Sequence, residues 1–182
     1  AEEFGVSRTP IRQILQMLES ERLVEIRDGV GTIVTGVDFR RLRGVYDLRL
    51  RITELIGDSI DRYRARDALS EVTGLIERAE ALKVRPDIRS YWVLESDRHR
   101  LINSLIANEP LREIHDSLYM QTSRAWYDIS ESVWPEALEA LFAELVELRR
   151  ALDVGDLPSI GFASRNYVAY SMTRLSRYFD PT

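Results

Sequence analysis

The chain has no cysteine among its 182 residues. This absence excludes disulfide bonds, thiolate metal sites and cysteine nucleophiles, and it fits a cytoplasmic protein. No apolar run approaches the roughly 18–20 residues that a membrane-spanning helix needs, and no segment resembles a signal peptide. The sequence also lacks internal repeats and low-complexity segments. These absences predict a cytoplasmic globular protein with no membrane partner.

Positive charge is scarce as well. Aspartate and glutamate outnumber lysine and arginine by 30 to 25, which gives a formal net charge of −5 and a pI near 5.2. Such a chain does not coat nucleic acid through bulk charge, although it can still present a small basic surface. Its composition, 45% hydrophobic and 30% charged, is that of a globular protein rather than a disordered one.

Short helical and strand-like patterns alternate over the first 34 residues. Residues 1–4 are typical of a helix end, and Gly5 is a natural residue to follow it. After Ser7, a typical N-cap residue, helical spacing predicts a second helix. Its buried stripe would consist of Ile11, Ile14, Leu15 and Leu18. Two strand-like runs, 23–27 and 32–34, then enclose a glycine-containing turn. This is the order of a winged helix-turn-helix.

The opposite side of the second helix carries side chains that can donate hydrogen bonds. They are Arg8, Thr9, Arg12, Gln13 and Gln16. The second helix of a helix-turn-helix lies in the major groove, where an arginine can bond O6 and N7 of guanine as a fork. With Ser7 at the helix N-terminus and Gly29 at the wing tip, this set predicts a DNA-binding surface. The alternative is an ordinary surface with two solvated arginines.

The charge balance of this segment limits its general attraction to DNA. Residues 1–36 contain four arginines (8, 12, 22 and 27) against six acidic residues (2, 3, 19, 21, 25 and 28). Non-specific affinity from counterion release should therefore be modest. Attraction to DNA has to come from where the arginines lie on the surface and from the presence of two protein chains in the complex. The chain also begins inside the motif, because a winged helix normally has one more helix in front. We therefore expect the natural protein to be longer at its N-terminus.

The stretch "AEEFGVSRTPIRQILQMLESERLVEIRDGVGTIV" resembles the helix-turn-helix and wing of the GntR family of bacterial transcription regulators. That family carries "LAEEFGVSRTPVREAL", then "L…GLVE" and a glycine-containing wing. The resemblance implies that Arg8, Thr9 and Arg12 contact operator bases and phosphates. It also places Asp28 and Gly29 at the wing tip, where the family reaches the minor groove. Asp28 brings a negative charge to that tip.

From residue 38 onward the pattern is helical almost throughout. The segment 38–60 carries apolar residues at helical spacing. They are Leu42, Val45, Leu48, Ile52, Leu55 and Ile56. Further helices are expected at about 69–83, 88–107, 110–130, 135–152 and 158–178, with proline, glycine and asparagine between them. We expect a mostly α protein, with a winged helix-turn-helix domain at 1–36, a linker near 35–38, and an all-α bundle within 37–182.

This helical part resembles the C-terminal domain of the FadR-type branch of GntR regulators, called FCD. The stretches "VYDLRLRITELI", "LESDRHRLINSLIANEPLREI" and "RRALDVGD" match its signatures in the correct order. That domain usually holds a metal through one aspartate and three histidines, beside a small carboxylate effector. The four ligand positions of that domain correspond in this chain to Glu95, His99, Leu145, and either Asn166 or Tyr167. His115 matches no ligand position and is expected on the surface or packed.

A glutamate and a histidine one helical turn apart are weak evidence for a metal site, since such pairs are common on helix surfaces. Without two more nitrogen or oxygen donors, Glu95 and His99 would bind a transition metal poorly. We therefore expect no tightly held metal, while a divalent metal at this pair stays an open, disfavoured alternative. No other cofactor is indicated.

The effector pocket can exist without the metal. Because Leu145 offers only apolar carbon, the expected occupant is a small organic metabolite held by apolar contact and a few polar anchors. Arg49 could clamp a carboxylate, and Asn166 and Tyr167 could supply hydrogen bonds beside Glu95 and His99. The alternative for Arg49 is an ion pair with Glu54 or with another helix.

These patterns predict a ligand-responsive transcription regulator that acts as a homodimer on a near-palindromic operator. A metabolite in the helical domain would change the spacing of the two DNA-binding heads. One alternative is a helical enzyme that uses Glu95 and His99 as acid and base. No nucleophile motif or phosphate loop accompanies that pair, so we do not expect an enzyme. Another alternative is a partner-binding module whose winged helix does not bind DNA.

Overall fold

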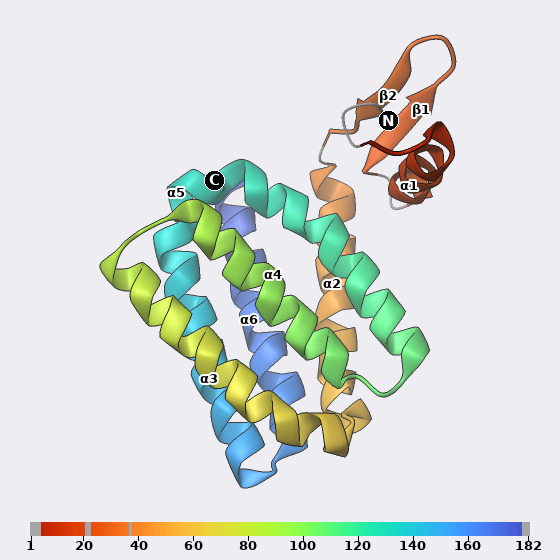
Figure 1. Ribbon diagram of the computed structural model, residues 1–182. Helices are drawn as coiled ribbons and strands as arrows, with labels where there is room; N and C mark the ends of the chain where they lie inside the picture. Colours follow the sequence, from red (N-terminus) through yellow and green to blue (C-terminus); the bar gives the residue numbers. More distant parts are fainter. Residues whose placement is uncertain (1–4, 21–22, 37, 180–182) are drawn as a thin grey trace. The chain divides into compact units, whose positions relative to one another are not determined.

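The structure is a computed structural model that describes residues 5–20, 23–36 and 38–179 (Figure 1). The chain forms two compact units, Ala1–Asp38 and Phe39–Thr182. This division lies two residues after the boundary expected from the sequence. The helix end expected at residues 1–4, and position 37 of the expected linker, lie outside the described residues.

The first unit contains one helix and a two-stranded ribbon. Helix α1 (Arg8–Ser20) leads into β1 (Val24–Arg27) and β2 (Gly31–Val34). The strands are antiparallel, with Val24 opposite Val34 and Arg27 opposite Gly31. The turn between them needs glycine, because Gly29 and Gly31 have φ angles of 74° and 115°, which other residues rarely adopt. This is the helix-and-wing order that the sequence predicts.

Helix α1 is less buried than its pattern suggests. None of its residues is fully buried, and Ile14, expected in the buried stripe, is 48% exposed. The described part of this unit packs only the ribbon against α1, and a ribbon covers one side of a helix. The Glu19 carboxylate fixes that packing by accepting a hydrogen bond of 2.9 Å from the backbone N–H of Ile26.

The second unit is a bundle of α-helices. In chain order these are α2 (Phe39–Ile56), the short 3-10 turn η2 (Gly57–Ser59), α3 (Arg62–Val84), α4 (Ile88–Leu105), α5 (Glu109–Val154) and α6 (Leu157–Phe179). The side chains of Asp61, Asp87 and Asn108 cap the N-termini of α3, α4 and α5 by accepting backbone N–H groups. The mostly α fold expected from the sequence is confirmed.

Two helix boundaries differ from the sequence-based expectation. α3 begins at Arg62, well before the expected start near residue 69, because Asp61 caps it there. The helices expected at 110–130 and 135–152 are one continuous helix, α5, with Pro135 inside it. A proline removes one backbone hydrogen bond, yet the helix continues past it, and Ala137 and Leu138, two and three residues further on, are buried in the core.

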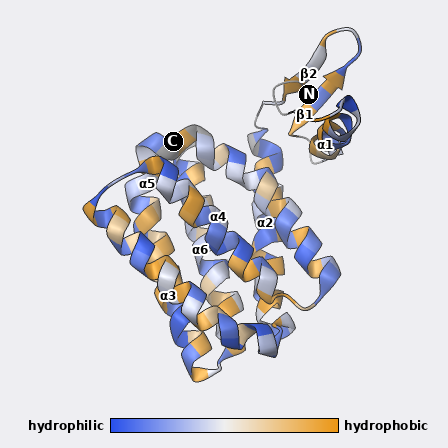
Figure 2. Cartoon of the chain, viewed as in Figure 1, coloured by the Kyte–Doolittle hydropathy of each residue, from blue (hydrophilic) through white to orange (hydrophobic). Residues whose placement is uncertain are grey.

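The bundle core is apolar and is drawn from all five helices. Orange, hydrophobic segments alternate with blue ones along α3 and α4 (Figure 2), as expected for helices that are buried on one face. On α2 the expected stripe is partly wrong. Leu48 and Leu55 are 46% and 53% exposed, whereas Tyr46, Arg49 and Thr53 are buried. None of the described helices is long and apolar enough to cross a membrane.

Helices α2 and α6 pack closely where two glycines meet. A Cβ atom at Gly161 would lie 2.8 Å from the backbone nitrogen of Gly57 and 3.0 Å from the carbonyl oxygens of Thr53 and Glu54. The absence of a side chain at position 161 therefore allows the backbones to touch. This contact fixes the end of α2 that follows Arg49 and so positions the polar residues described next.

Candidate functional site

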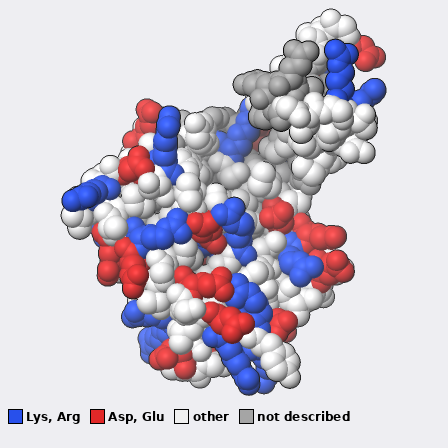
Figure 3. All heavy atoms as spheres, in the orientation of Figure 1, with Lys and Arg blue, Asp and Glu red and all other residues white. Residues whose placement is uncertain are grey.

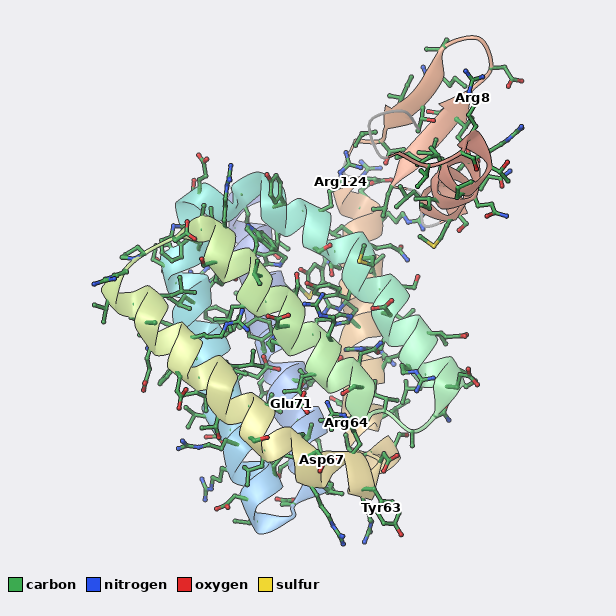
Figure 4. The ribbon with its side chains drawn as sticks, in the orientation of Figure 1. Arg8, Tyr63, Arg64, Asp67, Glu71 and Arg124 are labelled. Atoms are coloured by element: carbon green, nitrogen blue, oxygen red, sulfur yellow. The ribbon has the colours of Figure 1, made fainter. Side chains whose placement is uncertain are left out.

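The first candidate site is an open groove on the winged-helix unit. It has a volume of about 390 Å³, and its polar lining includes Arg8, Arg12 and Gln16 from α1 and Thr32 from β2. These α1 residues recur every four positions and therefore share one helix face. Figure 4 labels the Arg8 side chain on this unit. Helix and wing thus present donors to the same space.

The two arginines of this groove are free to bind something else. Neither Arg8 nor Arg12 makes a hydrogen bond or ion pair with any residue that the structure describes. Arg27 on the ribbon differs, because it pairs with Glu25 at 3.0 Å. Glu19 also lines the groove, but its carboxylate is engaged by the backbone of β1. The groove therefore offers two guanidinium groups one turn apart.

The remaining residues of the predicted DNA-binding set are exposed but lie outside this groove. Ser7 directly precedes α1, and Gly29 lies in the turn of the wing. Thr9 and Gln13 are exposed on α1 and lie about 100° around the helix from Arg8 and Arg12. The structure thus brings Arg8, Arg12 and Gln16 together and leaves Thr9 and Gln13 on an adjacent face.

The second candidate site is a small polar cavity inside the helical bundle. Its volume is about 20 Å³, and α2, α4, α5 and α6 all contribute to its wall. That volume holds about one water molecule, whereas sites for organic ligands typically measure roughly 300–1,000 Å³. The pocket expected for an organic metabolite is therefore closed in this structure, because Tyr91, Trp92, Tyr119, Trp126 and Tyr167 fill the space between the helices.

Arg49 is a buried cation in the wall of this cavity. Its side chain donates a hydrogen bond to the Thr122 hydroxyl, and its guanidinium carbon lies 5.8 Å from the ring centres of Tyr46 and Tyr119. Its Nε–H is buried and has no partner among the described residues. The ion pair with Glu54 considered above is wrong, because Glu54 binds Arg165 at 2.8 Å.

The burial of Arg49 has an electrostatic cost that its neighbours offset only in part. Removal from water lowers the pKa of its guanidinium and the charge of Arg98 lowers it further, while the charge of Glu95 favours the charged form. A cation in this position, with an unused N–H donor beside a cavity, is suited to an anionic group.

Glu95 lies in the same wall but is held by an arginine that the sequence interpretation missed. Arg98 donates from Nε and Nη2 to the two Glu95 oxygens at 2.7 and 2.9 Å. Its Nη1 donates to both oxygens of Glu144 at 3.0 and 3.1 Å. The Tyr167 hydroxyl donates to Glu95 at 3.2 Å. Glu95, Arg98 and Glu144 are all less than 10% exposed.

The charges of this cluster depend on one another. Burial alone would lower the pKa of Arg98, but Glu144 and Glu95 hold it well above its ordinary value. Burial raises the pKa of Glu144 to about 7, although Arg98 opposes that rise. We take Arg98 as charged, because its fork is bonded to both carboxylates. Arg98 therefore limits a rise that burial would otherwise carry further.

His99 and His115 form a stack beside the cluster. The ring centre of His99 lies 3.6 Å from that of Tyr119 and 4.9 Å from that of His115. The Nε2 of His99 is 2.7 Å from an oxygen of Asp116, and its buried Nδ1 has no partner in the described part of the chain. Burial lowers the pKa of both imidazoles, that of His115 more strongly. His115 is thus packed rather than exposed.

The residues at the positions carried over from the metal site do not fit a metal ion. Arg98 occupies both oxygens of Glu95, and Asp116 engages His99. Leu145 is fully buried and aliphatic. Asn166 is exposed and does not line the cavity, which corrects its assignment to the pocket, whereas Tyr167 does line it. Within the described residues, no group of three or more His, Asp or Glu side chains could hold a metal.

Comparisons with known proteins match the first domain by sequence. Residues 1–34 match the family model described as bacterial regulatory proteins, gntR family. A segment of 77 residues is 29% identical to the gluconate operon transcriptional repressor of Bacillus licheniformis and 26% identical to that of Bacillus subtilis strain 168. The segment covers 42% of this chain and 31% of each repressor, so the match spans about a third of those relatives.

Comparisons of the fold extend over nearly the whole chain. The structure described as E. coli McbR/YncC has a TM-score of 0.72 at 19% identity and covers 99% of this chain and 85% of its own. A GntR family regulator from Pseudomonas syringae has a TM-score of 0.55 at 18% identity, with coverage of 97% and 72%. At this level of identity the likeness concerns the fold.

Proposed function

Because this chain belongs to the GntR family of bacterial regulatory proteins, we propose that it is a transcription regulator that reads operator DNA through the groove on its winged helix. The observation that carries this proposal is the pair of unpartnered guanidinium groups, Arg8 and Arg12, on the wall that also contains Gln16. Arginines at the start of a recognition helix suit guanine edges and phosphates. Such a regulator acts in the cytoplasm.

The charge distribution of the helical unit favours the winged helix as the DNA-binding part. Lys and Arg side chains are interleaved with Asp and Glu over the face of the helical unit that Figure 3 shows. Such a mixture does not attract a polyanion. The two curated relatives are named transcriptional repressors, which favours a regulator over a helical enzyme or a partner-binding module.

The test uses the site that the protein itself selects from a random pool of DNA duplexes. Arg12→Ala should weaken binding to that site by about 1–3 kcal/mol if the side chain contacts a guanine. Met17→Ala is the matched control, because Met17 is exposed on the same helix but lies outside the groove and outside the predicted DNA-binding set. Equal affinity of the wild type for the selected site and for random duplex would contradict the proposal.

We further propose that the protein acts as a homodimer through the outer face of α2. The residues Val45, Leu48, Ile52 and Leu55 follow helical spacing and form an apolar stripe along that helix. Leu48 and Leu55 are about half exposed, and a contiguous exposed apolar surface is typical of an interaction site. A second copy of the chain can cover the stripe with an identical one, as twofold symmetry permits. A dimer would match the two halves of a near-palindromic operator.

The effector that we propose is a small organic anion bound beside Arg49. The unpartnered Nε–H of that buried side chain could donate a hydrogen bond to an anionic group, and the aromatic side chains of the wall could contact the carbon atoms of an organic molecule. Since the cavity has room for about one water, the effector can enter only if the surrounding helices move apart. Its binding energy would then favour one arrangement of the bundle over another.

Thermal unfolding in the presence of single small carboxylates tests this part of the proposal. A ligand that raises the melting temperature of the wild type should have little effect on Arg49→Met, which keeps the length of the side chain and removes its charge. Arg165→Met, on the surface pair with Glu54, is the control and should respond like the wild type. An equal response in Arg49→Met would exclude Arg49 as the anchor.

A further inference from the structure

The cluster of Glu95, Arg98 and Glu144, together with Tyr167, connects three helices at one point. Glu95 and Arg98 lie on α4, and Glu144 lies on the second half of α5. Tyr167 on α6 closes the cluster, because its hydroxyl donates to Glu95 and its ring centre lies 4.4 Å from the guanidinium carbon of Arg98. One cation therefore contacts side chains from α4, α5 and α6.

The cluster lies where the resemblance to FCD domains implies a metal ion. Glu95 stands at the position of the first ligand, Tyr167 is one of the two residues that correspond to the last, and Glu144 directly precedes Leu145 at the position of a third. Each of these side chains contacts Arg98 or a partner of Arg98 instead of offering a free lone pair to a metal. A divalent ion placed among them would meet the positive guanidinium at hydrogen-bond distance.

We propose that the guanidinium of Arg98 is a built-in cation that replaces a bound metal as the cross-link between α4, α5 and α6. The geometry is suited to this role, since a guanidinium fork can bind two carboxylates in a plane and cannot be deprotonated in proteins. With Arg49 close by, the region contains two buried arginines and two buried glutamates, so it already holds as many basic as acidic side chains without a metal.

The arrangement also fixes the wall of the cavity. Glu95 lines the cavity, whereas Arg98 does not. Arg98 binds both oxygens of Glu95 from behind and thereby holds the carboxylate in one orientation. Arg98 is therefore a positioning residue for the cavity, and the helical domain keeps its shape without any exchangeable ion.

The first experiment uses the wild-type chain, so that it does not depend on any variant folding. We expect its melting temperature to stay the same after dialysis against EDTA and after addition of Zn²⁺, Ni²⁺ or Mn²⁺. A fall of several degrees in EDTA that one of these metals reverses would overturn the proposal. DNA is absent from this measurement, so its outcome is independent of the proposed function.

The second experiment measures the coupling of Arg98 to its partners by urea unfolding. Arg98→Met leaves two carboxylates buried without a cation and should lower the folding equilibrium constant by roughly a hundred- to a thousandfold. Arg98→Met combined with Glu95→Gln and Glu144→Gln should recover most of that loss, because no uncompensated charge then stays buried. If Arg98→Met does not fold, the comparison is whether the triple variant folds, and a folded triple variant is the result that we expect.

A matched control is available on the surface of the same bundle. Arg64 on α3 forms a two-bond ion pair with Glu71, at 2.5 and 2.8 Å, in partly exposed surroundings (Figure 4). Arg64→Met should change the folding equilibrium constant less than fivefold, as for other exposed pairs. A triple variant that is no more stable than Arg98→Met, or an Arg98→Met effect as small as that of Arg64→Met, would overturn the proposal.

Discussion

The contact of α2 with α6 at Gly161 leads to a prediction about the stability of the helical unit. In Gly161→Ala the new Cβ would meet three backbone atoms of α2 and η2 at 2.8–3.0 Å. Backbone atoms cannot rotate away as a side-chain end does, so the helices must separate by a few tenths of an ångström. Overpacking of this kind costs about 1–3 kcal/mol.

A second glycine on the same bundle separates this steric cost from the helix propensity of alanine. Gly74 lies inside α3, and a Cβ there would meet nothing within 4 Å. Both substitutions gain about 1 kcal/mol from the better helix propensity of alanine. Gly74→Ala should therefore stabilise the protein, and Gly161→Ala should be about 1–3 kcal/mol less stable than Gly74→Ala.

Urea unfolding followed by circular dichroism at the helix band measures this difference directly. Thermal unfolding gives a second measure, since about 2–4 °C corresponds to 1 kcal/mol in a chain of this size. If Gly161→Ala stabilised the protein as much as Gly74→Ala, the backbones of α2 and α6 would not be in contact, and our account of how α2 is positioned would be refuted.

Three further predictions concern the histidine stack, the wing and the dimer. Burial and the charge of His99 depress the pKa of His115 well below 6.5. The neutral imidazole therefore contributes its full stability above pH 6.5, and this contribution is lost as the pH falls. The urea midpoint should accordingly fall less between pH 7.5 and pH 5.5 for His115→Leu than for the wild type. Asp28→Asn should raise the affinity for random duplex a few-fold in fluorescence anisotropy, and an unchanged affinity would mean that the wing tip stays away from phosphates. Leu48→Glu should convert a dimer to a monomer in sedimentation velocity, whereas Val93→Glu, at a similarly exposed position on α4, should not.

The winged-helix unit was predictable because its signals are local. A helix, a turn and a hairpin each depend on residues a few positions apart, and Gly29 and Gly31 mark the turn by the φ angles that it requires. The face of α1 that carries Arg8 and Arg12 follows from helical spacing alone. The amount of exposure at Ile14 could not be predicted in this way, since it depends on which other elements cover that side.

The bundle was predictable as a set of helices but not in its detail. Proline usually separates helices, so Pro135 suggested a break; the helix instead continues through it, although α5 changes direction part-way along its length (Figure 1). On α2 the hydrophobic pattern selected Leu48 and Leu55, whereas the buried face contains Tyr46, Arg49 and Thr53. Thr122 and Trp126 on α5 and the backbone carbonyl of Arg49 each give one of these buried side chains a hydrogen bond, whereas the Nε–H of Arg49 has no partner among the described residues.

A signal for the Arg98 cluster was present in the sequence. Glu144 lies three residues after Leu141 and four before Leu148, so it occupies a position in an apolar stripe. Arg98 occupies the same kind of position between Leu94 and Ile102. Two opposite charges that each interrupt a core stripe indicate a buried pair. Which helices meet at that point, and therefore which charges pair, depends on three-dimensional packing and could not be inferred from spacing.

Helix α5 has a mechanical consequence because it continues for 46 residues and changes direction part-way along (Figure 1). The part before Pro135 carries Tyr119 and Thr122 in the cavity wall, and the part after it carries Glu144. Proline weakens the backbone ladder at that one point, so bending concentrates there. From Pro135 back to Glu109 the helix is roughly 39 Å long. A bend of about 5° at Pro135 would therefore displace the far end of this arm by roughly 3 Å, which makes α5 a lever that amplifies small movements of the bundle.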